Sequence, residues 1–286
     1  MTDILVSVSE LASLLDGNPP VLLDVRWALG RTDGHERYRD NHIPTAIYVD
    51  LPTELSAAGL PTTSRPASGL PADGRHPLPD ITELQASARR WGIGADTPVV
   101  VYDATGNQAA ARAWWLLRWA GHDDVRMLDG GLTAWQDAGL PIRSGDETSR
   151  ATGDVVLRPG AMPTLTADDA ADFPGVLLDA RAGERYRGEV EPMDPRAGHI
   201  PGAVSAPTAD NVGADGRFRS PAELRERFAD IGIRAGDTVG VYCGSGVTAA
   251  HEVAALALAG IDAALFPGSW SAWSSDPDRP VATGPE

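Results

Sequence analysis

The sequence predicts an α/β protein built from two similar domains, each with a mostly parallel sheet flanked by helices. Two observations predict this architecture. Short apolar runs rich in branched residues alternate with longer segments of helical length, a pattern typical of parallel sheets covered on both faces. In addition, several segments of the first half of the 286-residue chain return in the same order in the second half, as expected of a duplicated domain.

The repeated segments follow one another along both halves of the chain. Those of the first half are PVLLDVR (20–26), HERYRD (35–40), HIPTA (42–46), VVVYDATG (99–106) and GGLTAW (130–135). Their counterparts are GVLLDAR (175–181), GERYRG (183–188), HIPGA (199–203), VGVYCGSG (239–246) and GSWSAW (268–273). We therefore predict an N-terminal domain over 1–143, a polar linker over 144–162 and a C-terminal domain over 163–286.

The individual elements can be placed within each half. The runs VLLDV, PVVVY, VLLDA and TVGVY have the length and branched composition of strands. The segments 109–120 and 247–259 have helical length, and a glycine follows each one, which is a common helix stop. A stretch at 56–80 is rich in Gly, Pro and Ser, and it is interpreted as a surface excursion of the first domain.

Composition narrows the possible partners and compartment. The chain is 42% hydrophobic and carries a formal net charge of -16, which argues against a nucleic-acid or anionic membrane surface as partner. One cysteine in the whole chain allows no internal disulfide. The N-terminus lacks a basic segment followed by an apolar core, and no run approaches the roughly 18 apolar residues of a membrane span. We expect a cytoplasmic protein.

The single cysteine, Cys243, stands where a predicted strand meets a predicted helix. Gly244 and Gly246 allow a turn whose successive N–H groups form a small concavity for an anion, and the helix N-terminus adds partial positive charge. Such surroundings favour the thiolate, the nucleophilic form of cysteine. The alternative is a small buried apolar residue, the usual fate of a free cysteine. The equivalent residue of the first half is Asp103, and an unpartnered buried charge is costly, so we expect both positions to line an open pocket.

With these segments the chain resembles the tandem-domain rhodanese family of sulfurtransferases. The resemblance spans nearly the whole chain and rests on the LLDVR and LLDAR strands, both HIP segments, the VYC strand end and the GSW element. It implies two rhodanese-like domains, of which the first has lost its cysteine. It also implies a six-residue active loop, Cys243-Gly244-Ser245-Gly246-Val247-Thr248. This uncharged loop is similar to that of 3-mercaptopyruvate sulfurtransferases, whereas thiosulfate enzymes typically place basic residues directly after the cysteine.

The resemblance further implies a reaction and a set of helper residues. Sulfur from 3-mercaptopyruvate would form a persulfide on Cys243 and pass to a thiol, such as that of thioredoxin, or to cyanide. No metal or organic cofactor is required. The donor-binding arginines of the family match Arg185 and Arg196, and an arginine fork suits a carboxylate. Ser245 would assist proton transfer with His42 and Asp33. The second HIP segment favours a structural turn histidine for His42, at the interface between the domains, over an acid–base role, and Asp33 is the weaker match of the two.

Three other functions remain to be weighed. Thiosulfate as the main donor keeps the fold and the cysteine. Phosphatase or arsenate reductase chemistry is disfavoured because those relatives use a longer loop that contains arginine. A carrier that only accepts sulfur from a partner is compatible with every motif, and turnover with a small-molecule donor would separate it from an enzyme.

Overall fold

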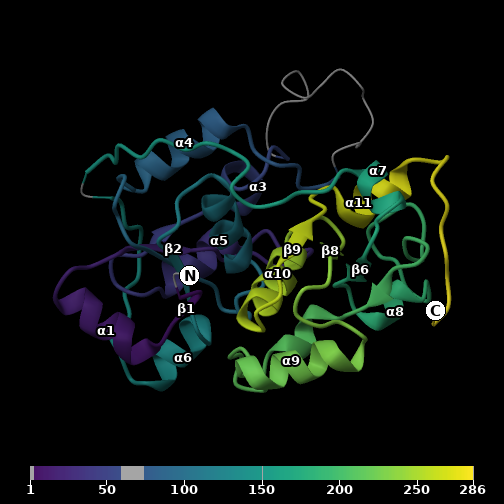
Figure 1. Ribbon diagram of the computed structural model, residues 1–286. Helices are drawn as coiled ribbons and strands as arrows, with labels where there is room; N and C mark the ends of the chain where they lie inside the picture. The colour runs from purple at the N-terminus through teal and green to yellow at the C-terminus, as the bar shows by residue number, and fades with distance from the viewer. Residues whose placement is uncertain (1–2, 59–73, 150, 286) are drawn as a thin grey trace. The chain divides into compact units, whose positions relative to one another are not determined.

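Each half of the chain builds its own parallel sheet. The computed structural model describes residues 3–58, 74–149 and 151–285, and all strand pairs within these residues that belong to the two sheets run parallel. The first sheet has the order β1-β5-β4-β2-β3 and the second the order β7-β6-β8-β9 (Figure 1). The strands are β1 (Leu5–Val6), β2 (Val21–Asp24), β3 (Ile47–Tyr48), β4 (Val99–Tyr102), β5 (Val125–Leu128), β6 (Val176–Asp179), β7 (Val204–Ser205), β8 (Val239–Tyr242) and β9 (Ala263–Leu265).

The register shows the duplication. Asp24 on β2 is opposite Tyr102 on β4, and Asp179 on β6 is opposite Tyr242 on β8. The residues that follow these tyrosines therefore leave the two sheets at equivalent carboxyl ends, the edge at which open α/β sheets carry their sites. In the second sheet, an isolated parallel bridge between Thr164 and Leu265 takes the place of β1.

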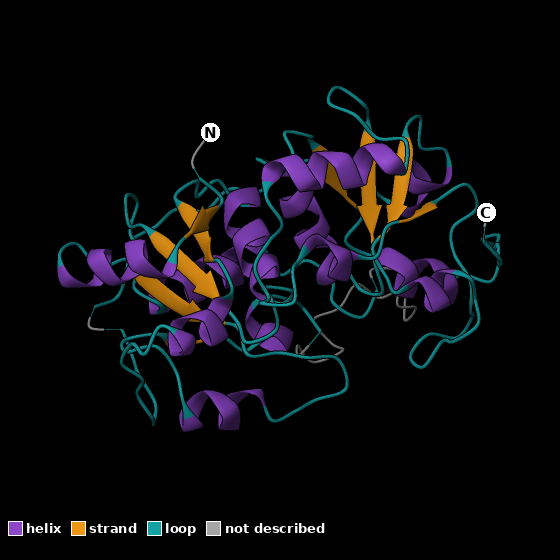
Figure 2. Ribbon diagram, turned by 90° about the horizontal axis from the view of Figure 1, so that it is seen from below, coloured by secondary structure: helices purple, strands orange, loops and turns teal. Residues whose placement is uncertain are grey.

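Helices flank both sheets (Figure 2). They are α1 (Val8–Asp16), α2 (Gly34–Asp40), α3 (Leu51–Glu54), α4 (Ile81–Arg90), α5 (Ala110–Trp119), α6 (Gly131–Asp137), α7 (Ala167–Ala171), α8 (Gly183–Tyr186), α9 (Pro221–Asp230), α10 (Thr248–Leu258) and α11 (Ser269–Ser275), with a 3₁₀ helix, η2 (Thr208–Asn211). The two predicted long helices correspond to α5 and α10. The predicted α/β class with parallel sheets is confirmed. No helix of the described residues is long and apolar enough to cross a membrane.

The local sequence explains where several helices begin. Ser7 accepts a hydrogen bond from the Glu10 N–H at the start of α1. Thr166 and Ser220 form complete capping boxes at α7 and α9, in which side chain and backbone satisfy each other's N–H groups. Each half also has its own apolar core, in which a tyrosine of the central strand packs with a tryptophan of the GLTAW or GSWSAW segment.

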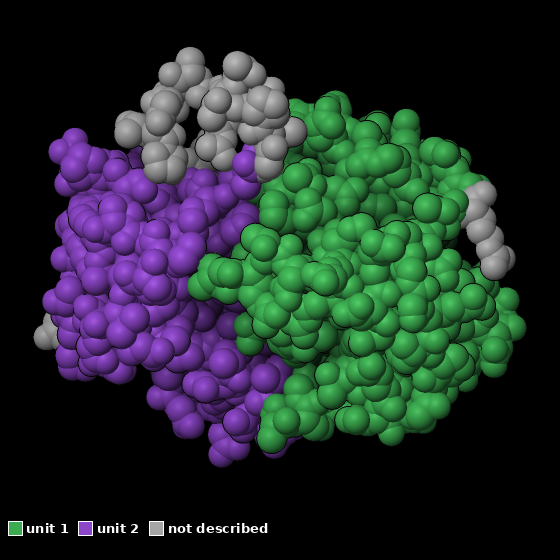
Figure 3. Space-filling model, turned by 180° about the vertical axis from the view of Figure 1, so that it is seen from behind, with its two compact units in different colours: residues 1–56, 79–162, 213–218 green, residues 57–78, 163–212, 219–286 purple. Residues whose placement is uncertain are grey.

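The chain divides into two compact units whose boundaries cross the sequence halves. Unit 1 contains residues 1–56, 79–162 and 213–218, and unit 2 contains residues 57–78, 163–212 and 219–286 (Figure 3). The excursion after residue 56 was expected to belong to the first domain, but its described residues group with unit 2. The physical reason is hydrogen bonding to the second half, for example from the Arg75 N–H to Ser271 Oγ at 3.0 Å.

The described residues of the segment predicted as a linker, 144–149 and 151–162, belong to unit 1. The Gly153 N–H donates to the Arg89 carbonyl at 2.8 Å, and the Arg158 N–H donates to the Ala120 carbonyl at 2.9 Å. These bonds satisfy backbone groups that a free linker would leave to water.

Candidate active site

The Cys243 loop connects β8 to α10. Cys243 follows Tyr242 directly, and α10 begins at Thr248 after a buried Val247. Gly246 has a φ of +76°, and a Cβ placed on it would lie 2.4 Å from the Pro267 carbonyl oxygen. Only glycine satisfies both the positive φ and this close approach.

The cysteine sulfur is enclosed by its own loop. The Gly246 N–H donates to Cys243 Sγ at 3.1 Å, and Ser269 Oγ lies 4.0 Å from the same sulfur. Ser269 Oγ also accepts the Cys243 N–H at 3.1 Å. Cys243 is 1% exposed, so the expectation of a thiol open to solvent was wrong. The loop curls around the sulfur and points an N–H group at it, an arrangement suited to a thiolate or a persulfide.

The repeated GSW element fixes this loop in place. At the start of α11, the Trp270 N–H donates to the Cys243 carbonyl and the Ser271 N–H donates to the Gly244 carbonyl, both at 2.9 Å. Unit 1 repeats the first bond, since the Leu132 N–H donates to the Asp103 carbonyl at 2.8 Å. The tryptophan segment therefore positions the residue after the central strand in both units.

Ser245 has a histidine partner that sequence reasoning missed. His76 Nδ1 lies 2.8 Å from Ser245 Oγ, and both side chains are buried, with 8% and 5% exposed. His76 belongs to the segment 57–78 of unit 2, which has no counterpart in the second half of the sequence. The same signal, a polar residue in a segment without a repeat, singled out Arg196 and applies equally to His76.

The two other predicted proton-transfer residues belong to unit 1. His42 is fully buried, its Nδ1 lies 2.9 Å from the Tyr38 carbonyl, and its ring stacks on the Tyr38 ring at 4.2 Å. His199 makes the same contacts with Tyr186 in unit 2, at 2.8 and 3.8 Å. This shared geometry favours the structural alternative for His42, a histidine that holds the turn after α2 or α8.

Asp33 is engaged by a neighbour on its own loop. Arg31 Nε donates to Asp33 Oδ1 at 3.0 Å, and the side-chain hydrogen bonding of Arg31 lowers the pKa of Asp33. A carboxylate held in its charged form by an arginine is a poor proton acceptor near neutral pH.

Two arginines lie over the start of the active loop. A Cβ placed on Gly244 would lie 3.3 Å from Arg185 Nη1 and 3.1 Å from Arg75 Nη2. Glycine at this position therefore leaves the space that the guanidinium groups use. Arg185 was predicted from the sequence, whereas Arg75, next to His76, was not. Together they can bind the carboxylate of a small anionic molecule beside Cys243.

Arg196, the other predicted donor-binding residue, is engaged by backbone carbonyls. Its guanidinium donates to the carbonyls of Ser274, Arg279 and Trp273 at 2.8, 2.8 and 3.0 Å, and also to that of Asp276. These carbonyls lie at the C-terminal end of α11 and just beyond it. The bonds favour a role for Arg196 in capping this helix, because a substrate carboxylate would have to displace them.

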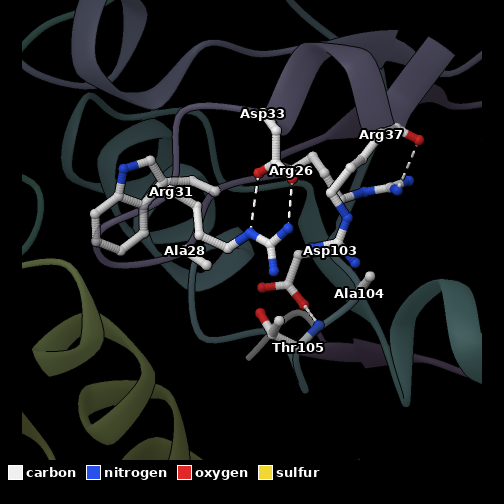
Figure 4. Close-up of a pocket in the computed structure, with 9 residues that line it drawn as sticks. Arg26, Ala28, Arg31, Asp33, Arg37, Asp103, Ala104 and Thr105 are labelled. Atoms are coloured by element: carbon white, nitrogen blue, oxygen red, sulfur yellow. Dashed lines mark hydrogen bonds and ion pairs between the residues drawn. The ribbon is translucent and has the colours of Figure 1, made fainter. Parts of the chain in front are cut away.

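Unit 1 carries the counterpart of the active loop, with a carboxylate in place of the thiol (Figure 4). Asp103 Oδ1 accepts the N–H groups of Thr105 and Asn107 at 2.7 and 2.8 Å, and Oδ2 accepts those of Ala109 and Ala110 at 2.8 and 3.1 Å. Asp103 was expected to line an open pocket; it does line a pocket, but its side chain is only 1% exposed. The four N–H groups supply the partners that a buried charge needs.

The Asp103 loop demonstrates what this type of loop can bind. It carries an anion on a ring of backbone N–H groups at the start of α5, just as the Cys243 loop presents an N–H to sulfur at the start of α10. A small pocket beside Asp103 is lined by further charged residues, among them Arg26, Arg31 and Arg37 (Figure 4). Among the described residues, no group of three His, Cys, Asp or Glu side chains could hold a metal ion.

Comparison with known proteins gives consistent matches along the chain. The model of the rhodanese-like domain matches residues 7–138 and again 164–276. A protein named "Putative thiosulfate sulfurtransferase SseB" from Mycobacterium tuberculosis is 48% identical over 98% of this chain and 97% of its own length. A "Probable 3-mercaptopyruvate sulfurtransferase" from Pseudomonas aeruginosa is 46% identical over 98% of each chain. The crystal structure of SseA from Escherichia coli, described as a 3-mercaptopyruvate sulfotransferase, has a TM-score of 0.78 at 31% identity and covers 94% of this chain and 100% of its own.

Proposed function

The chain belongs to the rhodanese-like family, and on that premise we propose that it is a sulfurtransferase that takes sulfur from 3-mercaptopyruvate. The two relatives named above are almost equally similar and carry names with different donors, so overall identity does not choose between them. The site supports the choice of 3-mercaptopyruvate. The single observation that carries it is the hydrogen bond between Ser245, in an uncharged loop, and His76, because only a donor with a carbon leaving group needs a proton there.

The first half-reaction uses the residues around the cysteine. The Cys243 thiolate attacks the donor sulfur, the carbon–sulfur bond breaks, and its electron pair passes to the carbon as the enolate of pyruvate. Ser245 delivers a proton to this leaving group and is reprotonated through His76. Arg185 and Arg75 hold the donor carboxylate beside Gly244. The persulfide that remains on Cys243 accepts the Gly246 N–H in its anionic form.

The second half-reaction returns the enzyme to its starting state. A thiol or cyanide attacks the outer sulfur, the sulfur–sulfur bond breaks, and its electron pair returns to Cys243 as thiolate, giving ping-pong kinetics. We expect a dithiol protein of the thioredoxin type as acceptor and transfer in the cytoplasm. No step calls on a metal or an organic cofactor.

The experiment that tests this function is a comparison of initial rates with 3-mercaptopyruvate and with thiosulfate, with cyanide as acceptor. We expect the first donor to be strongly preferred and the Cys243→Ala variant to be inactive. Mass spectrometry after incubation with donor alone should show one added sulfur atom at Cys243, an unambiguous assignment because the chain has one cysteine.

Two results would replace the proposal. A preference for thiosulfate would keep the nucleophile and move the protein to the thiosulfate class. A persulfide that forms only from a partner protein, with no turnover of either small donor, would make the protein a sulfur carrier.

A further inference from the structure

Two buried carboxylates face the arginines that lie over the active loop. Glu191 accepts hydrogen bonds from Arg185 Nη2 at 2.7 and 2.9 Å. Asp194 forms an ion pair with Arg75 and lies 3.4 Å from Arg185 Nη2. The side chains of both carboxylates are only 3% exposed. The arginine side chains are 23% (Arg75) and 14% (Arg185) exposed. Partly buried charges are screened less by solvent than exposed ones, so they act on a group that binds beside Gly244.

The backbone holds Glu191 in this place independently of the arginines. Glu191 Oε1 accepts the N–H groups of Met193 and Asp194 at 3.0 and 3.1 Å. The turn over 191–194 therefore presents both carboxylates to the same side. Such a turn is built to bring negative charge to the loop, because each carboxylate costs desolvation that a neutral side chain would avoid.

The charges around Gly244 balance. Arg75 and Arg185 contribute two positive charges, and Glu191 and Asp194 contribute two negative ones. Arg181, which also contacts Glu191 at 3.4 Å, has its own partner in Asp179, with Nε 2.9 Å from Oδ1. The donor-binding edge consequently offers guanidinium N–H groups without an excess of positive charge. A singly charged carboxylate can accept hydrogen bonds from these N–H groups. The second negative charge of a dianion would gain little additional electrostatic attraction, because the site has no net positive charge.

We propose that Glu191 and Asp194 determine donor specificity by neutralising Arg185 and Arg75, so that the site accepts a singly charged 2-oxo carboxylate and discriminates against the dianion thiosulfate. This inference rests on the proposed function, since it concerns the donor of the same site. Donor choice would then depend on Glu191 and Asp194, which lie outside the active loop, as well as on the uncharged loop itself.

The test removes one negative charge at a time while keeping side-chain shape. In Glu191→Gln and Asp194→Asn, we expect the ratio of kcat/KM for thiosulfate to kcat/KM for 3-mercaptopyruvate to rise about tenfold or more, as expected when a close charge is unmasked in a poorly screened site. Glu189→Gln is the matched control. Glu189 is 55% exposed and pairs with Arg187, so its loss should leave the ratio unchanged.

A binding measurement makes the test independent of turnover. In a Cys243→Ser background, calorimetry should show that Glu191→Gln and Asp194→Asn each bind thiosulfate more tightly than the parent. Unchanged thiosulfate affinity and an unchanged donor ratio would overturn the inference, as would an equal loss with both donors, which indicates a purely structural role. Thermal melting identifies a variant that fails to fold. If one of the two variants does not fold, the donor ratio and thiosulfate affinity of the other one test the inference. A wild-type protein inactive with both donors would instead contradict the proposed function while leaving the binding result to judge the inference.

Discussion

At the scale of single residues, the molecule uses one loop design for two different anions. Asp103 and Cys243 follow equivalent strands, and backbone N–H groups point at both side chains. In unit 1 the acceptor is a carboxylate that is covalently part of the chain. In unit 2 it is a thiol that can carry charge or an additional sulfur. The exchange of one residue therefore separates the carboxylate loop of unit 1 from the proposed active loop of unit 2.

The Asp103 carboxylate should stabilise unit 1. In Asp103→Ala, four N–H groups lose their acceptor, and we expect a loss of about 2–4 kcal/mol in the free energy of unfolding, since charged hydrogen bonds and helix caps are each worth about 1–3 kcal/mol. Chemical denaturation measures this loss. Asp137→Ala, at an exposed end of α6, is the control and should change stability little. An equally small effect at Asp103 would show that its hydrogen bonds contribute little to the free energy of unfolding.

The Ser245 and His76 pair should act in proton transfer to the leaving group. We expect Ser245→Ala and His76→Gln each to lower kcat with 3-mercaptopyruvate about 10²- to 10³-fold, the usual size of general acid–base assistance, with little change in the melting temperature. Steady-state kinetics with each variant provides the measurement.

His42→Gln is the informative counterpart to these variants. Because His42 is stacked on Tyr38 within unit 1, its loss should lower the melting temperature and leave kcat of the folded protein near that of the wild type. The opposite result would be a His42 variant with normal stability and a much lower kcat, together with a His76 variant that stays active. That result would assign proton transfer to His42 instead of His76.

At the scale of elements, α11 positions the active loop. Its N-terminal residues bind the carbonyls of Cys243 and Gly244, and its C-terminal carbonyls are bound by Arg196. The chain before His199 is tied to the same helix, since Trp270 Nε1 donates to the Arg196 carbonyl at 2.9 Å. A short helix of seven residues is thus fixed at both ends.

Arg196 should contribute to stability more than to donor binding. We expect Arg196→Ala to reduce the free energy of unfolding by about 1–3 kcal/mol, because four buried or partly buried carbonyls lose a charged donor. KM for 3-mercaptopyruvate should stay near the wild-type value, whereas Arg185→Ala should raise it at least tenfold. The comparison of the two KM values is the measurement. A large rise in KM for Arg196→Ala with normal stability would support its predicted role as a donor-binding residue.

At the scale of the whole molecule, neither unit is made from one continuous half of the chain. Unit 2 contains residues 57–78, which supply Arg75 and His76 to the Cys243 loop, and unit 1 contains residues 213–218. In unit 1, the Phe218 N–H donates to Asp129 Oδ1 at 3.0 Å. The duplicated halves have therefore exchanged short segments, and unit 2 is complete only in a chain that also contains residues 57–78.

A chain truncated to residues 163–286 should lack donor turnover even where it retains the Cys243 loop. It lacks the guanidinium of Arg75 and the imidazole of His76, so its rate with 3-mercaptopyruvate should fall at least as far as that of His76→Gln. Circular dichroism would report whether the truncated chain is folded. Wild-type turnover by the folded fragment would show that residues 57–78 contribute nothing to the reaction.

The architecture, and the prediction that Cys243 is the nucleophile, followed from the sequence alone. Strand and helix patterns are local, and the repeated segments place Cys243 and Asp103 at the same strand end without any coordinates. The uncharged loop and Arg185 in GERYRG could be identified in the same way, because they follow recognisable segments. Histidines in both HIP segments already indicated a shared turn, as the stacked His42 and His199 pairs illustrate.

The contacts between groups far apart in the sequence could be seen only in the folded chain. The His76 contact with Ser245 spans 169 positions, and no periodicity records such a separation. Arg75 joins Arg185 for the same reason, and the carbonyls that surround Arg196 come from residues 77 to 83 positions away. The buried Asp103 was misjudged because burial alone does not set the cost of a charge. Four backbone N–H groups of the folded loop donate to the carboxylate and lower that cost. The direction in which these N–H groups point depends on the fold of the loop and cannot be read from the identity of residue 103.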